Sequence, residues 1–184
     1  MTEIDESSYL RFLRGDTDAL EELIRTYADH IVRFAYSYVK NADVAEEVME
    51  DTFAALFMKA RKVRDEHHLR AYLFKIARNK CIDHLRHHRN CISLNDVEYA
   101  LSGQDLQHDY FRQERDRMIY ICMQRLPADY REVLQLTYFD AFCVQEICTV
   151  MGKSAKQVYN LLARAKESLK ELLVKEGIGN EDLS

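Results

Sequence analysis

Apolar side chains recur every three or four residues along most of this 184-residue chain. Between residues 17 and 40 this spacing places one apolar stripe on a single face of a helix. The stripe consists of Leu20, Ile24, Tyr27, Ile31, Phe34 and Tyr38. The same spacing predicts helices over residues 43–62 and 69–90, so the first 90 or so residues form one helical domain.

The ends and inward faces of these helices follow from the same pattern. Asp43 followed by Glu46 predicts a capping box at the start of the second helix. The second helix is expected to bury Val44, Val48, Phe53, Leu56 and Phe57, and the third Leu69, Leu73, Ile76, Ile82 and Leu85. The polar stretch 64–68, RDEHH, separates the two helices.

The periodicity weakens over residues 91–112, which we interpret as a linker, and a second helical region begins near Gln113. Pro127 fits just inside a helix start, where its missing N–H costs nothing. The stretch VQEICTVMGKSAKQVYNLL has helix–turn–helix spacing. Gly152 fits a turn with positive φ, Ser154 fits the N-cap of the second helix, and Val158 is its apolar anchor.

Composition supports an all-α fold with two small helical domains. Five Gly and one Pro are too few for a turn-rich β protein, and a hydrophobic content of 47% suffices for a core. The predicted domains span residues 1–90 and 113–184, joined by a linker at 91–112. No apolar run is long enough to cross a bilayer, and the acidic N-terminus does not resemble a secretory signal. We therefore expect a cytoplasmic protein without membrane insertion.

Charge is distributed unevenly, although the net charge is −5. Residues 61–90 contain nine bases, three acids and five of the seven His, and residues 153–175 contain six bases and two acids. Residues 1–60 carry 13 acids and six bases. Two basic islands in an acidic chain indicate local binding of a polyanion.

The second basic island lies on the helix–turn–helix, whose second helix would enter the major groove. Its exposed positions are Lys153, Lys156, Gln157, Tyr159 and Asn160. Asn and Gln suit adenine, and Lys suits guanine or phosphate. The alternative is an amphipathic bundle helix with a solvated charged side. The GKS at 152–154 is not a phosphate-binding loop, because Ile147 stands where that motif needs Gly.

The first island mixes aromatics with bases, since Tyr72 and Phe74 lie among Arg70, Lys75 and Arg78. Aromatic rings beside cations suit unstacked bases. For Phe74 alone, a place in the core is the favoured interpretation. The acidic residues Glu46, Glu47, Glu50 and Asp51 fit either a solvated face or a dock for a basic partner, and the residues alone favour the solvated face.

Five Cys without an export signal indicate reduced thiols. Cys81, His84, His88 and Cys91 have a spacing that could hold zinc, but one helix rarely closes a tetrahedral site. We therefore predict no metal and no cofactor, and interpret the His as exposed or close to phosphate. No catalytic constellation occurs, so an enzyme is the least favoured class.

Three segments in order carry a family resemblance: AEEV at Ala45–Val48, IARN at Ile76–Asn79, and LPADYREVLQLTYFD followed by the helix–turn–helix. Over about residues 9–174 the chain resembles the extracytoplasmic-function (ECF) sigma factors of bacteria, the small branch of the sigma-70 family. The resemblance implies a factor that binds core RNA polymerase and directs initiation at promoters. It also implies regulation by an anti-sigma factor that covers the two domains or wedges between them.

The resemblance assigns three sets of residues. The helix around 43–53 would dock on the clamp helices of the largest polymerase subunit, through Asp43, Glu46, Glu47, Glu50 and Asp51. The first island would engage the −10 element, through Arg64, Arg70, Tyr72, Lys75, Arg78, Asn79 and Arg86, with the loop from Arg64 to Leu69 holding an unpaired base. The −35 element would be read by Lys153, Ser154, Lys156, Gln157, Tyr159 and Asn160, with Arg164 and Lys166 near phosphate.

The chain departs from the family pattern at three positions. Many members have Gln at Glu50, Ser at Cys143 and Arg at Leu161. Cys143 is a poor cap, so the helix after it is expected to fray, and Leu161 removes a cation from the reading helix. We expect no extra C-terminal domain after Ser184.

The length of the predicted linker is compatible with a protein that binds DNA at two sites. A linker of about 22 residues spans up to roughly 70 Å, about two turns of B-DNA. Two weak modules gain affinity when they are tethered to one duplex. The alternatives are a stand-alone helix–turn–helix regulator acting as a dimer on palindromic DNA, and a zinc-dependent redox sensor using the Cys/His set.

Overall fold

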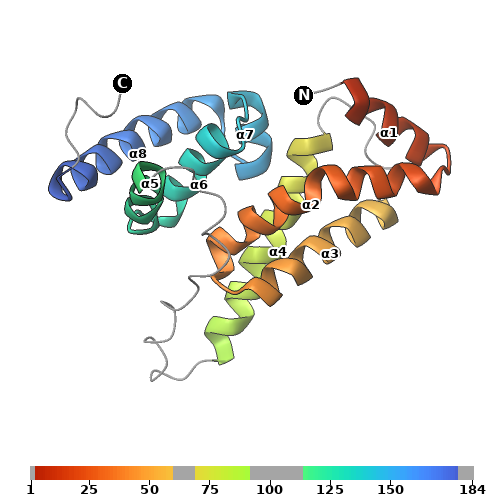
Figure 1. The fold of residues 1–184 in the computed structure, drawn as a ribbon, viewed down its shortest axis with the longest axis horizontal. Helices are drawn as coiled ribbons and strands as arrows, with labels where there is room; N and C mark the ends of the chain where they lie inside the picture. The colour runs from red at the N-terminus through yellow and green to blue at the C-terminus, as the bar shows by residue number, and fades with distance from the viewer. Residues whose placement is uncertain (1–2, 60–68, 92–113, 178–184) are drawn as a thin grey trace. The chain divides into compact units, whose positions relative to one another are not determined.

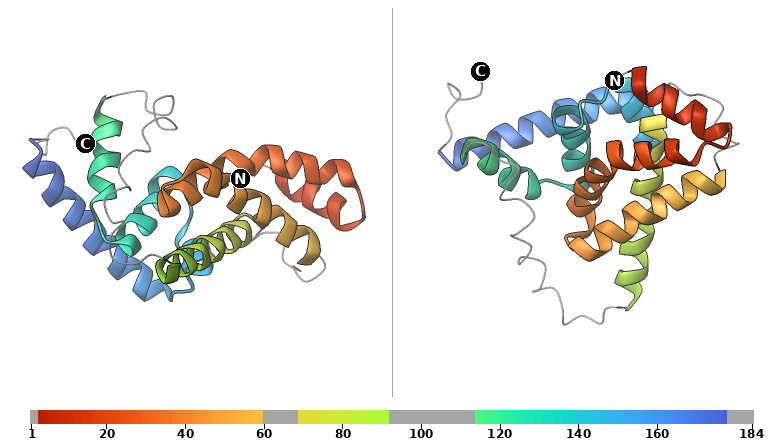
Figure 2. Two further views of the ribbon diagram at one scale, coloured as in Figure 1. Left: turned by 90° about the horizontal axis from the view of Figure 1, so that it is seen from below. Right: turned by 45° about the vertical axis from the view of Figure 1, so that its right-hand side comes forward.

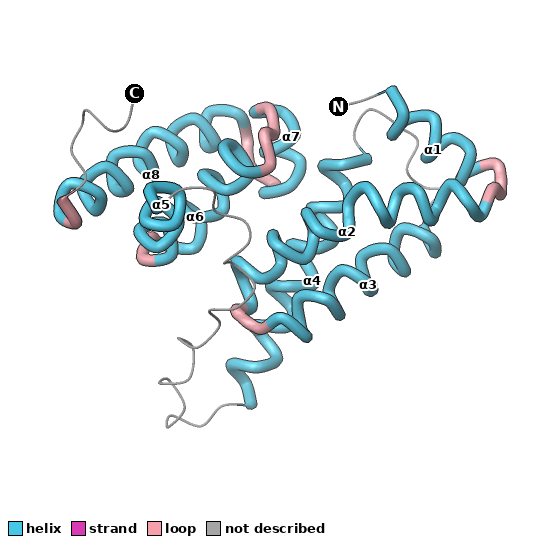
Figure 3. Tube along the Cα trace, in the orientation of Figure 1, coloured by secondary structure: helices cyan, strands magenta, loops and turns pink. Residues whose placement is uncertain are grey.

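The computed structural model describes residues 3–59, 69–91 and 114–177, and these residues form helices and connecting turns without a strand (Figure 3). Contacts divide the chain into a first unit, Met1–Gly103, and a second unit, Gln104–Ser184. The prediction of an all-α protein with two helical domains is therefore confirmed. The boundaries at 90 and 113 stay predictions, because the linker lies outside the described residues.

The first unit consists of α1 (Glu3–Leu13), α2 (Thr17–Val39), α3 (Ala42–Lys59) and α4 (Leu69–Cys91) (Figure 1). Helix α2 packs against each of the other three, and α3 also packs against α4. The core is mainly apolar, with Leu23, Ile31, Phe34, Leu56, Leu73 and Phe74 almost completely buried. Burial of this kind supplies the main stabilisation of a small helical domain.

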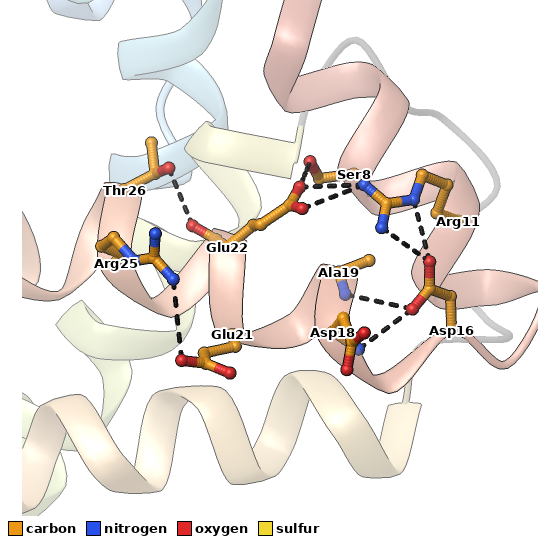
Figure 4. A network of polar contacts seen from close by, with 9 residues as sticks. All are labelled: Ser8, Arg11, Asp16, Asp18, Ala19, Glu21, Glu22, Arg25 and Thr26. Carbon is orange, nitrogen blue, oxygen red and sulfur yellow. Dashed lines mark hydrogen bonds and ion pairs between the residues drawn. The ribbon is translucent and has the colours of Figure 1, made fainter.

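Helix α1 was not predicted from the sequence, and a polar network holds it on α2 (Figure 4). Arg11 donates from Nε to Asp16 Oδ2 at 2.8 Å and from Nη1 to Glu22 Oε1 at 3.0 Å. Ser8 Oγ donates to Glu22 Oε2 at 2.6 Å. Asp16 also caps α2, because its Oδ1 accepts from the backbone N–H of Asp18 at 3.0 Å. Tyr9 and Phe12 complete the contact as buried aromatics.

Two sequence predictions for α3 were wrong. The helix starts at Ala42, and Asn41 Oδ1 accepts from the Val44 N–H at 3.1 Å, so Asn41 caps it in place of the expected Asp43–Glu46 box. Phe57 was expected in the core, but 61% of its surface is exposed. It lies near the end of α3, where its ring meets Phe12 of α1 at 6.1 Å between centroids.

The second unit consists of α5 (Glu114–Gln124), α6 (Ala128–Leu134), the π-helix η5 (Gln135–Phe139), α7 (Val144–Met151) and α8 (Ala155–Lys175). Helix α8 packs against α5, α6 and α7, and Figure 2 gives two further views of these elements. Leu134, Leu136, Ile147, Val158 and Leu173 form its core. Arg125 at the end of α5 also pairs with Glu176, the C-cap residue of α8.

Helices α7 and α8 form the expected helix–turn–helix. Gly152 has φ +65° and donates its N–H to Cys148 O, which ends α7 as predicted. Ser154 is the N-cap of α8, also as predicted. Pro127 stands one position earlier than expected, as the N-cap residue of α6. At the start of α7, Glu146 Oε2 accepts from the Cys143 N–H at 2.8 Å and so supports the weak cap.

Candidate nucleic-acid interfaces and docking surface

Helix α8 exposes one face and buries the other. Val158 and Ala165 are completely buried, which fixes the rotation of the helix about its axis. The exposed side then carries most of the residues predicted to read the −35 element, namely Ser154, Lys156, Gln157, Tyr159, Asn160, Arg164 and Lys166. The structure therefore gathers these residues on the solvent side of one helix, as a major-groove helix requires.

Part of this face forms a shallow groove of about 250 Å³. Lys153, Gln157, Asn160 and Arg164 line it together with Leu161. Leu161 is the position at which a cation was expected from the family pattern. The groove thus combines amide and cationic groups with one apolar side chain, a combination suited to base edges and to the thymine methyl group.

Two of the groove residues already have partners within the protein. Lys153 Nζ lies 3.1 Å from Asp129 Oδ2, a carboxylate in the first turn of α6. Gln157 Oε1 accepts from the Ser154 N–H at 2.8 Å and from Ser154 Oγ at 3.0 Å. Asp129 was not singled out from the sequence, because its meeting with Lys153 depends on how α6 packs.

Lys166 lies over the ring of Tyr138, with Nζ 5.5 Å from the ring centroid. Tyr138 belongs to η5 and is 58% exposed. This cation–π contact holds the lysine beside an aromatic surface. Sequence reasoning missed Tyr138, since nothing in the helical spacing indicates an outward aromatic in a π-helix.

The described part of the first basic island lies on α4, whose buried side contains Ala71, Phe74, Ala77 and Cys81. The favoured place of Phe74 in the core is confirmed. Lys75, Asn79 and Arg86 are exposed, and Tyr72, Arg70 and Arg78 are half-buried. Arg86 lies 3.7 Å from Asp83 on the same helix. Arg64 lies outside the described residues.

Two residues of α2, His30 and Arg33, lie near Arg70 at the start of α4. Burial lowers the pKa of His30, and the charges of Arg33 and Arg70 lower it further. His30 is therefore uncharged at neutral pH. Because Arg33 of α2 and Arg70 of α4 both act on the same His30 ring, Arg33 lies near the start of α4. The helix pattern alone did not indicate this cation.

Helix α3 exposes the five predicted acids, Asp43, Glu46, Glu47, Glu50 and Asp51. Asp51 Oδ2 lies 2.7 Å from Lys80 Nζ of α4, so this carboxylate is already paired. Among the described residues the other four form no ion pair. The same helix ends with Phe57, 61% exposed, and Met58, 83% exposed. Exposed Phe and Met side chains are of the kind that is enriched at protein–protein interfaces.

Each of the two units matches a known protein family. A family model described as sigma-70 region 2 matches residues 23–91, and one described as sigma-70 region 4 matches residues 116–169. The two matches cover more than half of the chain, one in each unit. The chain belongs to the sigma-70 family. This sigma factor therefore carries a family match in each of its two helical units.

Curated relatives cover almost the whole sigma factor. The ECF RNA polymerase sigma factor SigM of Bacillus subtilis is 27% identical over 163 residues, which are 88% of this chain and 99% of SigM. The RNA polymerase sigma factor NccH of Alcaligenes xylosoxydans xylosoxydans is 29% identical over 179 residues, covering 92% and 95%. These likenesses confirm the ECF type, so the chain is a transcription initiation factor.

Solved structures have the same fold. CnrH, in complex with the cytosolic domain of CnrY, has a TM-score of 0.68 at 22% identity, covering 94% of this chain and 99% of CnrH. The sigma factor RpoE of Bartonella quintana, in complex with the anti-sigma factor NepR, has a TM-score of 0.64 at 21% identity, covering 83% and 95%. At these identities the likeness concerns the fold alone.

The Cys/His set does not gather into one cluster among the described residues of this sigma factor. Cys81 is completely buried, with its Sγ 4.0 Å from Ala35 O. His84 and His88 stack with their centroids 5.8 Å apart on the outer part of α4, and the side chain of Cys91 lies outside the described residues. Within the described ranges, no helix is long and apolar enough to span a membrane.

Proposed function

We propose that this sigma factor binds core RNA polymerase through α3, reads duplex −35 DNA with α8, and captures −10 bases at α4. The observation that carries the proposal is the presence of both sigma-70 matches in one chain, each on a unit with an exposed basic helix face. A stand-alone helix–turn–helix regulator is not favoured, because it leaves the region 2 match of the first unit unexplained.

For the −35 element, we propose that the groove of α8 faces base edges and that Lys156, Arg164 and Lys166 approach phosphates. The side chain of Asn160 lines the groove and has no hydrogen-bond partner among the described residues, so its amide is available to a base edge. Lys153 would exchange Asp129 for a phosphate or a guanine when DNA arrives. The ion pair is half-exposed, so this exchange costs little.

For the −10 element, we propose that Lys75, Arg78, Asn79 and Arg86 follow the strand along α4, with Arg70 and Tyr72 near its start. The segment from Arg64 to Leu69, most of which lies outside the described residues, would receive an unpaired base. Unstacking one base costs a few kcal/mol, which contacts to the extruded base offset. Arg33 of α2 would add a phosphate contact beside Arg70.

For polymerase docking, we propose that Glu46, Glu47 and Glu50 meet a basic surface while Phe57 and Met58 fill an apolar depression. Interface energy concentrates in a few buried apolar anchors, with charges that steer association. Asp43 lies on the same exposed face at the start of α3 and extends the acidic surface. Asp51 would contribute less than the free acids, because Lys80 already holds it.

We also propose that an anti-sigma factor holds this chain inactive. RpoE, which shares the fold, was solved with the anti-sigma factor NepR. The protein would act in the cytoplasm, where polymerase and promoter meet, and would itself catalyse no reaction.

Transcription in vitro tests the proposal. Core polymerase with this chain should initiate at promoters that core polymerase alone does not use. Glu46 and Glu50 are both exposed and lie one turn apart on α3. The double variant Glu46→Lys with Glu50→Lys should abolish binding to core polymerase, because it sets two cations against the proposed basic surface.

The matched control is Glu167→Lys with Glu171→Lys, which makes the same charge change at the same spacing on the exposed side of α8. This control should keep its affinity for core polymerase. Equal loss in both double variants would contradict a dock on α3, and initiation that does not depend on the chain would contradict the whole proposal.

A further inference from the structure

The capping box at the start of α8 uses a residue that is also expected to read DNA. Ser154 is the N-cap and Gln157 is the third residue of the helix. Gln157 Oε1 accepts from the Ser154 N–H at 2.8 Å and from Ser154 Oγ at 3.0 Å, and Ser154 Oγ accepts from the Gln157 N–H at 3.4 Å. Both halves of the reciprocal motif are therefore formed.

The chemistry of the motif fixes which end of the amide is engaged. A backbone N–H is a donor, so the atom of Gln157 that faces the Ser154 N–H must be the oxygen. The nitrogen, Nε2, is then the part of the amide left for a ligand. It has two N–H donors and no acceptor capacity. Gln157 also lines the groove with Asn160 and Arg164, so the amide lies within the surface proposed to face DNA.

A glutamine held in this way cannot make the two-point contact with adenine. That contact needs the amide oxygen to accept from N6 while the nitrogen donates to N7. Leaving the box would release Oε1 for adenine, but it would also leave the Ser154 N–H without its partner.

We propose that Gln157 reads the −35 element as a hydrogen-bond donor only, and that Ser154 is the positioning residue that keeps it so. This inference rests on the proposed role of α8 in −35 recognition. In the major groove guanine, adenine and thymine each present an acceptor, whereas cytosine presents only its N4 donor. Gln157 therefore disfavours cytosine at the base it contacts and tolerates the other three.

The test uses holoenzyme assembled from core polymerase and the full chain, with promoters carrying each of the four bases at every −35 position. Gln157→Ala identifies the contacted base as the one at which preference changes. At that base the wild-type protein should use guanine, adenine and thymine within a few-fold of one another. Cytosine should be weaker by roughly twofold to tenfold, the size of one hydrogen bond.

Three variants separate a positioning role of Ser154 from a purely structural one. Ser154→Ala keeps the backbone N–H that occupies one lone pair of the amide oxygen but removes the hydroxyl that occupies the other. The oxygen can then accept from adenine N6, so adenine should rise above guanine and thymine at that base. Ser154→Thr keeps the cap and should keep the wild-type profile. Gln157→Glu retains the box, because S-x-x-E is itself a capping box, but offers an acceptor to DNA. This variant should prefer cytosine, whose N4 donates to a carboxylate.

A wild-type preference for adenine over guanine and thymine by tenfold or more would overturn the inference, as would an unchanged profile in Ser154→Ala. Gln157→Glu that still disfavours cytosine would do the same. If Ser154→Ala lowers use of all four bases equally, Ser154 has a structural role only and the inference fails. Initiation that does not require this chain at all is a different result, which removes the proposed function itself.

Discussion

At the scale of single residues, two phenylalanines of the first unit have opposite environments. Phe34 is completely buried between Tyr38 and Phe74, with ring centroids 5.2 and 5.0 Å away, whereas Phe57 is 61% exposed. Phe34→Ala should lower the free energy of unfolding by about 3–5 kcal/mol. Phe57→Ala should cost much less stability but weaken binding to core polymerase. Chemical denaturation and a polymerase-binding assay on both variants test this difference. Equal destabilisation of the two variants would contradict the different environments assigned to Phe34 and Phe57.

Gly152 is a second position where one residue decides local structure. Its φ of +65° is one that L side chains rarely adopt, and an added Cβ would meet no atom within 4 Å. Gly152→Ala should therefore cost about 1–2 kcal/mol through backbone strain alone. Gly152→Asn should cost less, because Asn tolerates this conformation. Thermal unfolding of the two variants measures the difference, and an equal loss of stability in both would contradict an explanation based on φ.

At the scale of elements, α1 depends on charge. Hydrogen bonds from Arg11 hold the pKa of Asp16 below its ordinary value, and Ser8 and then Arg11 do the same for Glu22. Carboxylates with lowered pKa values stabilise the folded state above their unfolded pKa and lose this effect as pH falls through the folded one. The contribution is thus complete at pH 7 and is lost progressively below about pH 4.

Arg11→Ala tests this account. The difference in melting temperature between wild type and variant should be largest near pH 7 and should shrink as the pH is lowered from about 5 to 3. Circular dichroism follows the transition. Arg25→Ala is the control, because Arg25 pairs with Glu21 on the exposed side of α2 at 3.6 Å and its removal should change little. A wild-type–Arg11→Ala difference that stays constant across this range would argue against the network.

Some helices could be predicted from the sequence and others could not. Periodicity predicted α2, α3, α4 and the α7–α8 pair, because apolar residues recur at helical spacing in each. The rotation of the helices was predicted less well, since Leu20, Ile24, Ile76, Ile82 and Leu85 were expected to face inward and are only half-buried. Periodicity missed α1, which is held by the Arg11, Asp16 and Glu22 contacts and by two aromatics against α2, and it missed η5. The partners of Lys153 and Asp51 could not be predicted either, because they come from neighbouring helices whose packing no local pattern specifies.

At the scale of the whole molecule, each unit has its own buried core. We therefore expect the two units to unfold as separate cooperative transitions. Gly152→Ala should lower the transition of the second unit and leave that of the first unchanged, while Phe34→Ala should do the reverse. Hydrogen exchange measured along the chain follows the unfolding of each unit separately. A single transition moved by both variants would mean that the units fold together.

The ion pair between Asp51 and Lys80 has a consequence for how this protein can change over generations. It joins the helix proposed to meet polymerase to the helix proposed to meet the promoter. Asp51→Lys sets two cations side by side, and Lys80→Asp sets two anions side by side. Either change alone should weaken the contact between α3 and α4 by up to about 1 kcal/mol, because the pair is half-exposed, and the reciprocal exchange should restore the attraction. A genetic screen for suppressors of an Asp51 allele should therefore recover changes at position 80, and lineages descended from this chain should alter the two codons together.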